Sequence, residues 1–184
     1  MAVRPILLYG DPVLRKKADP IEETTEDICR LAEDMIDTMI KAEGIGLAAP
    51  QVGESIRMYV LNLEAINTDL FIYRSGTSFV GDPDNLVLIN PKIVRQEGEQ
   101  IGDEGCLSFP DIFDKVARPD VVRVEATELS GGALTIEGKG LLARVLIHEY
   151  DHLEGVLFID HLSKFRLQFL RTRLKKLKAR SEAD

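Results

Sequence analysis

The sequence predicts a single α+β domain in which antiparallel sheets pack around a central helix, with a further helix at the C-terminus. Three observations lead to this fold class. One helical segment is apolar around much of its circumference, as a buried helix is expected to be. Several segments rich in Val, Ile and Leu lie between turn-forming residues, as strands do. The 184 residues are enough for one domain with a sizeable core.

The first expected element is a helix from about Thr25 to Glu43. Its apolar residues recur at helical spacing and form one stripe: Ile28, Leu31, Met35, Ile36, Met39 and Ile40. Thr24 or Thr25 can cap its N-terminus, and Gly44 can adopt the left-handed conformation that ends many helices.

Four segments are expected to form strands: residues 56–63, 85–94, 121–129 and 133–137. The turn Ser130-Gly131-Gly132 between the last two predicts a hairpin. Residues 64–84, between the first two strands, are expected to form a long loop. In a compact domain such a loop is usually functional or mobile.

The central helix is expected in LLARVLIHEYDHLEG, which follows Gly140. The last segment, Leu162–Arg180, has basic residues on one side. Its other side is apolar: Leu162, Phe165, Phe169, Leu170, Leu174 and Leu177.

Charge is unevenly distributed along the chain. The net charge of −8 argues against a general nucleic-acid binder. Residues 164–184 carry +6, which leaves −14 for the preceding 163 residues. An acidic body with a basic C-terminal helix suggests that this helix has a partner of its own.

The remaining composition favours the cytoplasm. No apolar run reaches the roughly 18–20 residues that a membrane span needs. The start of the chain lacks the long apolar core and the cleavage site of a signal peptide. Two cysteines, Cys29 and Cys106, are too few for a disulfide scaffold and fit a reducing compartment.

The strongest chemical signal is the sequence His148-Glu149-Tyr150-Asp151-His152. Residues i and i+4 of a helix share a face, with Cβ atoms roughly 5–6 Å apart, so both imidazoles can reach one tetrahedral metal ion. Glu149 is rotated by about 100°, beside the position of the ion's water, where a general base is needed. The alternative is a pair of core histidines, but buried imidazoles without a metal would need other partners.

A catalytic metal site needs a third protein ligand. The extended peptidase pattern H-E-x-x-H-x-x-G-x-x-H is met at Gly155, but its last position is Phe158. The downstream Glu of other peptidases is also missing, since residues 171–178 contain none. A lone cysteine more often packs than ligates, but Cys106, next to Gly105, is the better candidate of the two cysteines.

Three motifs in this order, GIGLAAPQ (44–51), EGCLS (104–108) and HEYDHLEG (148–155), resemble the signature motifs of peptide deformylases. The opening YGDPVLRKKA (9–18) and the basic C-terminal helix are also similar, so the resemblance covers nearly the whole chain. It implies a metal-dependent hydrolase that removes the formyl group from the N-terminal formylmethionine of newly synthesised polypeptides and releases formate. It further implies a catalytic domain at residues 1–163, to which the basic helix at residues 164–184 is appended.

The resemblance also assigns roles to single residues. Four positions match the family's three metal ligands and its acid–base residue: Cys106, His148, His152 and Glu149. Gln51 matches the side chain that, with the backbone N–H of Leu107, stabilises the carbonyl oxygen as it becomes an oxyanion. The family's metal is usually Fe²⁺, with Zn²⁺, Ni²⁺ or Co²⁺ as alternatives, and a Cys/His/His set accepts all of them.

The methionine side chain of the substrate needs an apolar pocket. Leu141 and Val145 precede His148 on roughly the same helix face, and Ile45 or Gly46 can approach from the other side. These four are the candidate substrate-binding residues, although a core role would also explain them. Three positions depart from the family's commonest pattern: Phe113, Arg144 and Ile147. These departures affect the expected preference for the peptide part of the substrate, and not the expected hydrolysis reaction.

Polar neighbours are expected to support the ligands. Glu104 and Asp151 are candidates to accept the far N–H of a ligand histidine. Arg118 can neutralise a buried Glu104.

Two other functions stay open from the sequence. A zinc peptidase would use the same histidine pair and Glu149, but a third ligand other than Cys106. A non-catalytic ribosome-associated module with a relic site would bind without releasing formate. The basic helix itself has three possible roles, which are to cover the core, to bind membrane, or to contact the ribosome as in some family members.

Overall fold

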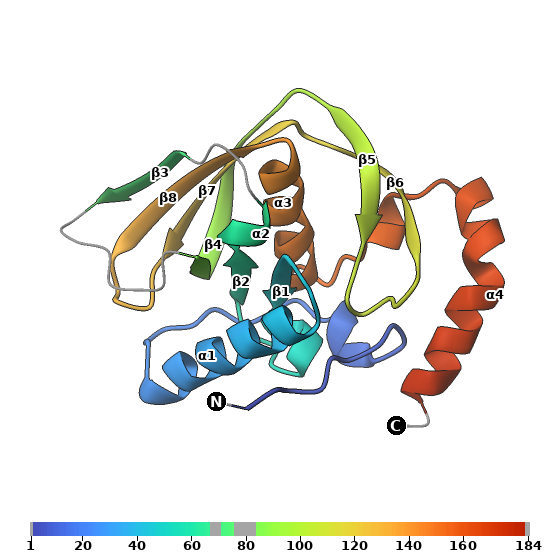
Figure 1. Cartoon of the computed structure of the whole chain (residues 1–184), viewed down its shortest axis with the longest axis horizontal. Coiled ribbons are helices and arrows are strands. Elements are labelled where there is room, and N and C mark those ends of the chain that lie inside the picture. The colour runs from blue at the N-terminus through green and yellow to red at the C-terminus, as the bar shows by residue number, and fades with distance from the viewer. Residues whose placement is uncertain (1, 67–70, 76–83, 183–184) are drawn as a thin grey trace.

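In the computed structural model, which describes residues 2–66, 71–75 and 84–182, a six-stranded antiparallel sheet curves around one helix, α3 (Leu141–Leu153; Figure 1). The strand order is β1-β2-β4-β7-β8-β3. The strands are β1 (Gly46–Ala48), β2 (Met58–Asn62), β3 (Phe71–Ser75), β4 (Asn85–Glu97), β7 (Val121–Thr127) and β8 (Ala133–Lys139). A hairpin of β5 (Gln100–Gly105) and β6 (Phe113–Arg118) lies on the other side of α3 (Figure 1). The predicted α+β fold around a central helix is therefore confirmed.

Helix α1 (Glu26–Lys41) begins as predicted but ends differently. The Thr25 hydroxyl accepts a backbone N–H of the first turn at 3.4 Å. The left-handed residue after the helix is Glu43 (φ 54°), and not Gly44 as predicted. Gly44 serves close packing instead, because a Cβ there would lie 2.8 Å from Cδ1 of Leu107.

The hairpin predicted at Ser130-Gly131-Gly132 is confirmed. It joins β7 to β8, with Val124 opposite Ile136 in the ladder. Gly131 has φ +83°, a conformation that residues with a Cβ rarely adopt.

The prediction of a loop at residues 64–84 is wrong in part. Helix α2 (Leu63–Ile66) opens this region, and β3 adds to the sheet with Phe71 opposite Glu137. Strand β8 would otherwise present unpaired backbone groups at this edge. The other residues of the predicted loop, 67–70 and 76–83, lie outside the described residues.

The β5–β6 hairpin escaped prediction because its composition is unusual for strands. Strand β5 has the sequence QIGDEG, rich in residue types that strands disfavour. The hairpin also buries three charged side chains, Glu104, Asp114 and Arg118. An inward-facing charge breaks the alternation of apolar and polar residues by which strands are found.

Three apolar clusters hold these elements together. Between α3 and the main sheet, Leu142 and Leu146 are completely buried. Met35 and Met39 are also completely buried, and they pack α1 against β1 and β2. The third cluster joins α4 (Lys164–Ser181) to the β5–β6 hairpin and to Leu14 and Phe158. The described residues also form 3-10 helices at η1 (Pro12–Arg15), η2 (Ala49–Val52) and η3 (Phe158–His161).

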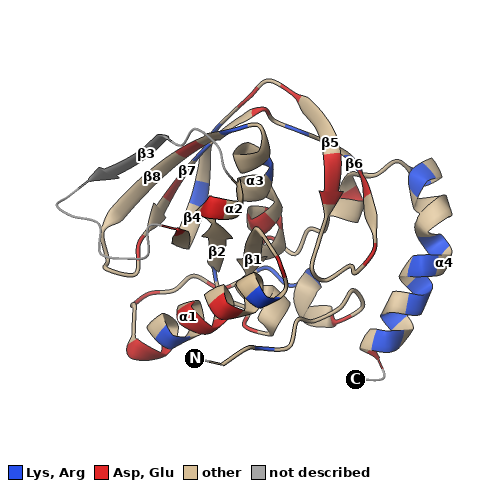
Figure 2. Ribbon diagram, viewed as in Figure 1, with Lys and Arg blue, Asp and Glu red and all other residues tan. Residues whose placement is uncertain are grey.

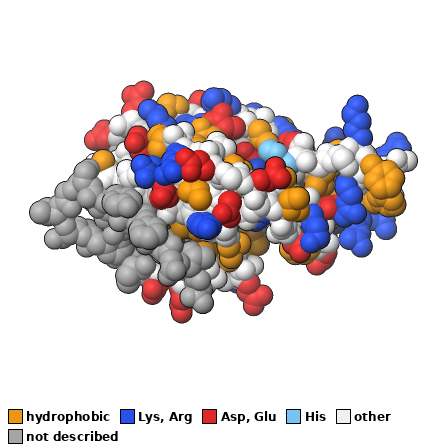
Figure 3. Space-filling view, turned by 90° about the horizontal axis from the view of Figure 1, so that it is seen from above, with side chains coloured by type: hydrophobic (Ala, Val, Ile, Leu, Met, Phe, Trp, Pro, Cys, Tyr) orange, Lys and Arg blue, Asp and Glu red, His pale blue; other side chains and the backbone are white. Residues whose placement is uncertain are grey.

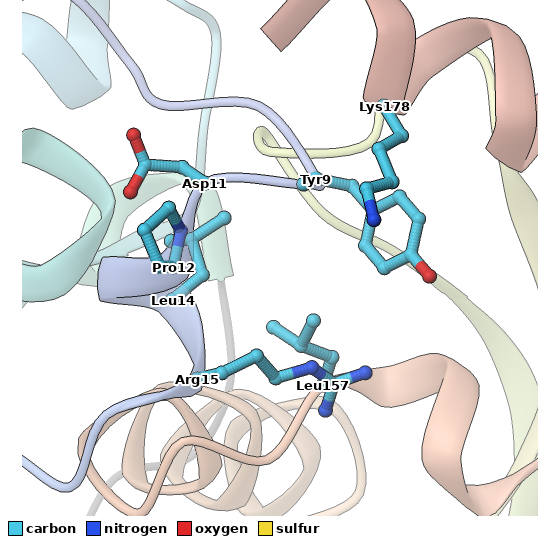
Figure 4. A pocket seen from close by; sticks show the side chains of 8 residues that line it. Tyr9, Asp11, Pro12, Leu14, Arg15, Leu157 and Lys178 are labelled. Atoms are coloured by element: carbon cyan, nitrogen blue, oxygen red, sulfur yellow. The ribbon is translucent and has the colours of Figure 1, made fainter. Parts of the chain in front are cut away.

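Helix α4 is only partly packed as predicted. Leu170, Leu174 and Leu177 are buried, but Phe165 and Phe169 are about two-thirds exposed and contact each other edge to face, with ring centroids 4.9 Å apart. Where α4 meets the N-terminal segment, a cavity of about 180 Å³ lies between Tyr9 and Lys178 on one side and Arg15 and Leu157 on the other (Figure 4). Among the described residues, no helix combines the length and apolar character needed to cross a bilayer.

Candidate active site

The three predicted metal ligands lie together beside the second half of α3. Cys106 Sγ and ring nitrogens of His148 and His152 all lie within 4.8 Å of one another. Cys106 directly follows β5, and its Sγ is 3.2 Å from Nε2 of His152. One thiolate and two imidazoles in this arrangement suit a tetrahedral divalent ion with one open position.

Glu104, on β5, orients the first of the two histidines. Its Oε1 lies 2.8 Å from Nδ1 of His148. Because a carboxylate can only accept, Nδ1 must carry the proton, and Nε2 keeps its lone pair for a metal ion. The second histidine, His152, has no partner for Nδ1 among the described residues.

Arg118, on β6, holds Glu104 in place. Its Nη2 and Nε donate to the two Glu104 oxygens at 2.6 and 3.1 Å. Burial disfavours the Glu104 carboxylate, but hydrogen bonds from His148 and Arg118 outweigh it and hold its pKa well below the usual range. Glu104 therefore stays ionised and accepts the hydrogen bond from His148 Nδ1. Asp151 contacts Arg118 Nη1 at 2.7 Å instead of a ligand histidine.

Glu149 faces the same site from α3. Its side chain is buried, and Oε2 has no hydrogen-bond partner in the described part of the chain. Burial raises the pKa of this carboxyl to about 7, against the opposing effect of His148. Gly46 makes room for it, because a Cβ at residue 46 would lie 2.5 Å from Glu149 Oε1.

Gln51, in η2, lies next to Cys106. Its Oε1 accepts the backbone N–H of Ala48 at 2.8 Å, which fixes the orientation of the amide. Its Nε2 lies 3.3 Å from Cys106 Sγ and 3.3 Å from Ser108 Oγ. The backbone N–H of the neighbouring Leu107 donates to no other group in the described ranges. The Leu107 N–H is thus available beside the three ligands, and the Gln51 amide lies next to it, with its Nε2 donating to Cys106 Sγ and Ser108 Oγ.

These groups open into one cleft of about 610 Å³. All four predicted substrate-binding residues line it: Ile45, Gly46, Leu141 and Val145. Ile45 and Gly46 come from the β1 side, and Leu141 and Val145 from the first turns of α3. The predicted catalytic residues Gln51, Leu107 and Glu149 line the same cleft.

Two residues at this site were not among the predicted site residues, although Arg144 is one of the departures from the family's commonest pattern. Arg144 is buried, lines the cleft, and donates to Glu104 Oε2 at 2.8 Å. His161, in η3, lies 2.8 Å from Asp151 Oδ2. For Arg144, its position in an otherwise apolar helix turn was a signal in the sequence that it has a role at the site. For His161 the sequence holds no comparable signal, because only the fold brings η3 against α3.

The sequence and the structure both have close relatives. The family model described as polypeptide deformylase matches residues 3–168. The chain is 43% identical to the peptide deformylase of Acidobacterium capsulatum, covering 99% of both chains. It is 47% identical to that of Caldanaerobacter subterraneus, covering 90% of this chain and 92% of the relative. The crystal structure of a peptide deformylase from Legionella pneumophila matches with a TM-score of 0.83 and 39% identity, covering 100% of this chain and 99% of the other.

Proposed function

Because this chain belongs to the polypeptide deformylase family, a family of metal-dependent hydrolases that remove the formyl group from N-terminal formylmethionine, we propose how its own residues perform that reaction. Cys106, His148 and His152 hold a single divalent ion. When bound, this ion polarises the formyl carbonyl and lowers the pKa of a water molecule. Fe²⁺ is the ion we propose, and Zn²⁺, Ni²⁺ and Co²⁺ suit the same donors.

Glu149 moves the proton. Its carboxylate takes a proton from the attacking water and delivers it to the amine nitrogen that leaves as the C–N bond of the formamide breaks. A pKa of about 7 supports this role, because the ionised and the protonated forms are then both accessible near neutral pH.

Gln51 and Leu107 stabilise the oxyanion. The Gln51 Nε2–H and the Leu107 backbone N–H donate to the formyl oxygen as negative charge develops on it. The N–H of Ala48 fixes the orientation of the Gln51 amide, and Nε2 exchanges one of its contacts to Cys106 Sγ and Ser108 Oγ for the formyl oxygen. Removing one such donor typically costs about 2.7–4 kcal/mol of transition-state stabilisation.

The substrate's first side chain occupies the apolar part of the cleft. Leu141 and Val145 on α3 and Ile45 and Gly46 on the opposite wall receive the methionine side chain. This orientation points the formyl carbon toward Glu149.

The observation that carries these assignments is the buried carboxylate of Glu149 in the same cleft as Cys106 and His148, two members of a ligand set whose atoms lie within 4.8 Å of one another. The test uses anaerobically purified protein with a formyl-Met peptide and its acetylated analogue, and measures formate, acetate and free amine. We expect formate from the first peptide and little acetate from the second. Absence of formate at every metal loading would contradict the assignment, and cleavage of internal peptide bonds would favour the peptidase alternative.

Two variants separate the proposed roles. Glu149→Ala is expected to keep its metal and lose turnover, whereas Cys106→Ala is expected to lose metal. Metal content by elemental analysis and formate release, measured on the same samples, distinguish these outcomes. Near-wild-type turnover of Glu149→Ala would remove the acid–base role.

We also propose that α4 contacts the ribosome and that the protein works in the cytoplasm, where formylated chains emerge. The observation behind this is the separation of charge: Lys and Arg cover α4, whereas Asp and Glu predominate in the body (Figure 2). At the end of the molecule that carries α4, these basic side chains surround exposed hydrophobic ones (Figure 3). On this proposal, residues 1–163 form the catalytic domain. Residues 164–184 are a segment appended to it that binds a partner.

A further inference from the structure

Arg144 is a charged residue in a place where an apolar one would be expected. It lies on α3 one turn before His148, and its side chain is only 5% exposed. It lines the cleft together with Leu141 and Val145, the residues that receive the substrate's first side chain. A guanidinium inside this part of the cleft changes what the pocket can accept.

The guanidinium of Arg144 is held in a fixed orientation. Its Nη1 donates to Glu104 Oε2 at 2.8 Å and to the backbone oxygen of Val116 at 3.0 Å. Gly102 on β5 lets it lie flat against the strand, because a Cβ there would be 3.1 Å from Nη2 and 3.4 Å from Cζ. The charge is thereby paired and the side chain cannot swing out of the cleft without breaking buried hydrogen bonds.

Part of the guanidinium is bound only weakly or not at all by the described part of the protein. The one contact of Nη2, to Gln100 Oε1, is long at 3.5 Å. For Nε, no acceptor is found among residues 2–66, 71–75 and 84–182. Because Arg144 lines the cleft, these are the N–H groups with which it can contact a ligand there.

A purely hydrocarbon side chain in this pocket would displace water from these donors and leave them unpaired. Leaving one buried donor unpaired costs on the order of tenfold in affinity. A side chain with an acceptor near its end avoids that loss. The thioether sulfur of methionine is a weak acceptor, and the sulfoxide oxygen of oxidised methionine is a stronger one.

We propose that Arg144 is a specificity-determining residue: its guanidinium forms a polar wall of the first side-chain pocket and selects formyl-peptides whose first side chain carries an acceptor over hydrocarbon side chains of equal length. The enzyme therefore deformylates peptides that begin with formyl-methionine sulfoxide as well as formyl-methionine, and discriminates against formyl-norleucine. This inference rests on the proposed function of the cleft.

A different role for Arg144 predicts a different result. If it acted only by supporting Glu104 and through it His148, its loss would lower turnover of every substrate by one common factor. A specificity-determining role changes the ratios between substrates that differ only in the first side chain.

The test measures kcat/KM for three peptides identical except for the first residue, which is formyl-Met, formyl-norleucine or formyl-methionine sulfoxide. For Arg144→Leu we expect the norleucine-to-Met ratio to rise about tenfold and the sulfoxide-to-Met ratio to fall about tenfold. Arg144→Lys, which keeps a donor, is expected to retain part of the wild-type order. Arg123→Leu, on the strand β7 outside the cleft, is the matched control and is expected to leave all ratios unchanged.

Wild-type protein alone also tests the inference, even if Arg144→Leu folds poorly. A wild-type preference for norleucine over sulfoxide by more than about tenfold would overturn it. So would an equal loss for all three peptides in a folded Arg144→Leu variant. Absence of formate from all three peptides with wild-type protein would instead contradict the proposed function, so the two failures are distinguishable.

Discussion

At the scale of single residues, the burial of Glu149 links catalysis to stability. Its pKa is raised from 4.5 to about 7 because burial disfavours the carboxylate. Between these two values the native state holds a proton that the unfolded state has released. The protein therefore loses stability as the pH rises through this window, by about 3 kcal/mol in the metal-free protein.

The variant Glu149→Gln is expected to remove this loss, because its side chain is neutral at every pH. In chelator, its melting temperature should exceed that of the wild type by several degrees at about pH 8, and the two should nearly coincide at about pH 5. Thermal unfolding of both proteins across this range measures the difference. A difference that is constant with pH, or that shrinks toward alkaline pH, contradicts the raised pKa.

Gly46 is expected to tolerate no side chain, because a Cβ would lie within 2.9 Å of three Glu149 atoms. In Gly46→Ala the carboxylate must move, and a small displacement of a reacting group can cost about 100-fold. We expect kcat to fall at least tenfold with metal content unchanged. Gly132→Ala is the matched control, since its nearest contact would be 3.4 Å away on an exposed turn. Equal activity of the two variants would show that Glu149 is not confined as the structure indicates.

Helical spacing identified His148, Glu149 and His152, whereas Gln51 and Leu107 were identified only through the resemblance to a known family. His148, Glu149 and His152 are separated by one and four positions of a single helix, so their relation needs no tertiary structure. The roles of Arg144 and His161, in contrast, could not be predicted from spacing. Their contacts are to Glu104 and Asp151, and which side chains meet across a core is set by packing that no local pattern encodes.

At the scale of elements, the packing of α4 divides its apolar residues into two groups. Leu174 is buried in the cluster that joins α4 to the rest of the molecule, whereas Phe169 is 66% exposed. Leu174→Ala is expected to lower the free energy of unfolding by about 2 kcal/mol or more. Phe169→Ala is expected to change it by less than about 0.5 kcal/mol.

Denaturant unfolding of both variants measures these free energies. A larger loss for Phe169→Ala would mean that α4 packs on the body through its other face. The comparison also tests whether residues 164–184 contribute to the stability of the catalytic domain, because an independent helix would show no loss for either variant.

The long helices and strands could be predicted because their apolar residues are numerous and regularly spaced. Helix α3 and strands β4 and β7 carry enough Leu, Ile and Val to identify them by composition alone. The β5–β6 hairpin could not, because its inward side chains are charged and are satisfied by partners on α3, η3 and α4. Strand β3 forms at the edge of β8, and the neighbouring turn-rich sequence concealed it.

At the scale of the whole molecule, the charge is divided between an acidic body and a basic C-terminal helix. The body carries −14 and residues 164–184 carry +6. On α4, Phe169, Arg173 and Lys176 are exposed and share a helix face. A basic surface with exposed aromatic side chains suits an anionic partner such as ribosomal RNA, and such binding weakens steeply with salt.

The double variant Arg173→Glu, Lys176→Glu is therefore expected to reduce cosedimentation with ribosomes by about tenfold at low salt, while kcat/KM for a short formyl-Met peptide stays within about twofold of wild type. The activity is expected to persist because both residues lie outside the cleft. Lys92→Glu, a basic residue of β4 in the body, is the matched control for loss of positive charge. Sedimentation that is unaffected by salt, or that is weakened equally by the control, would contradict a contact made through α4. A parallel loss of peptide turnover would instead mean that α4 supports the catalytic domain directly.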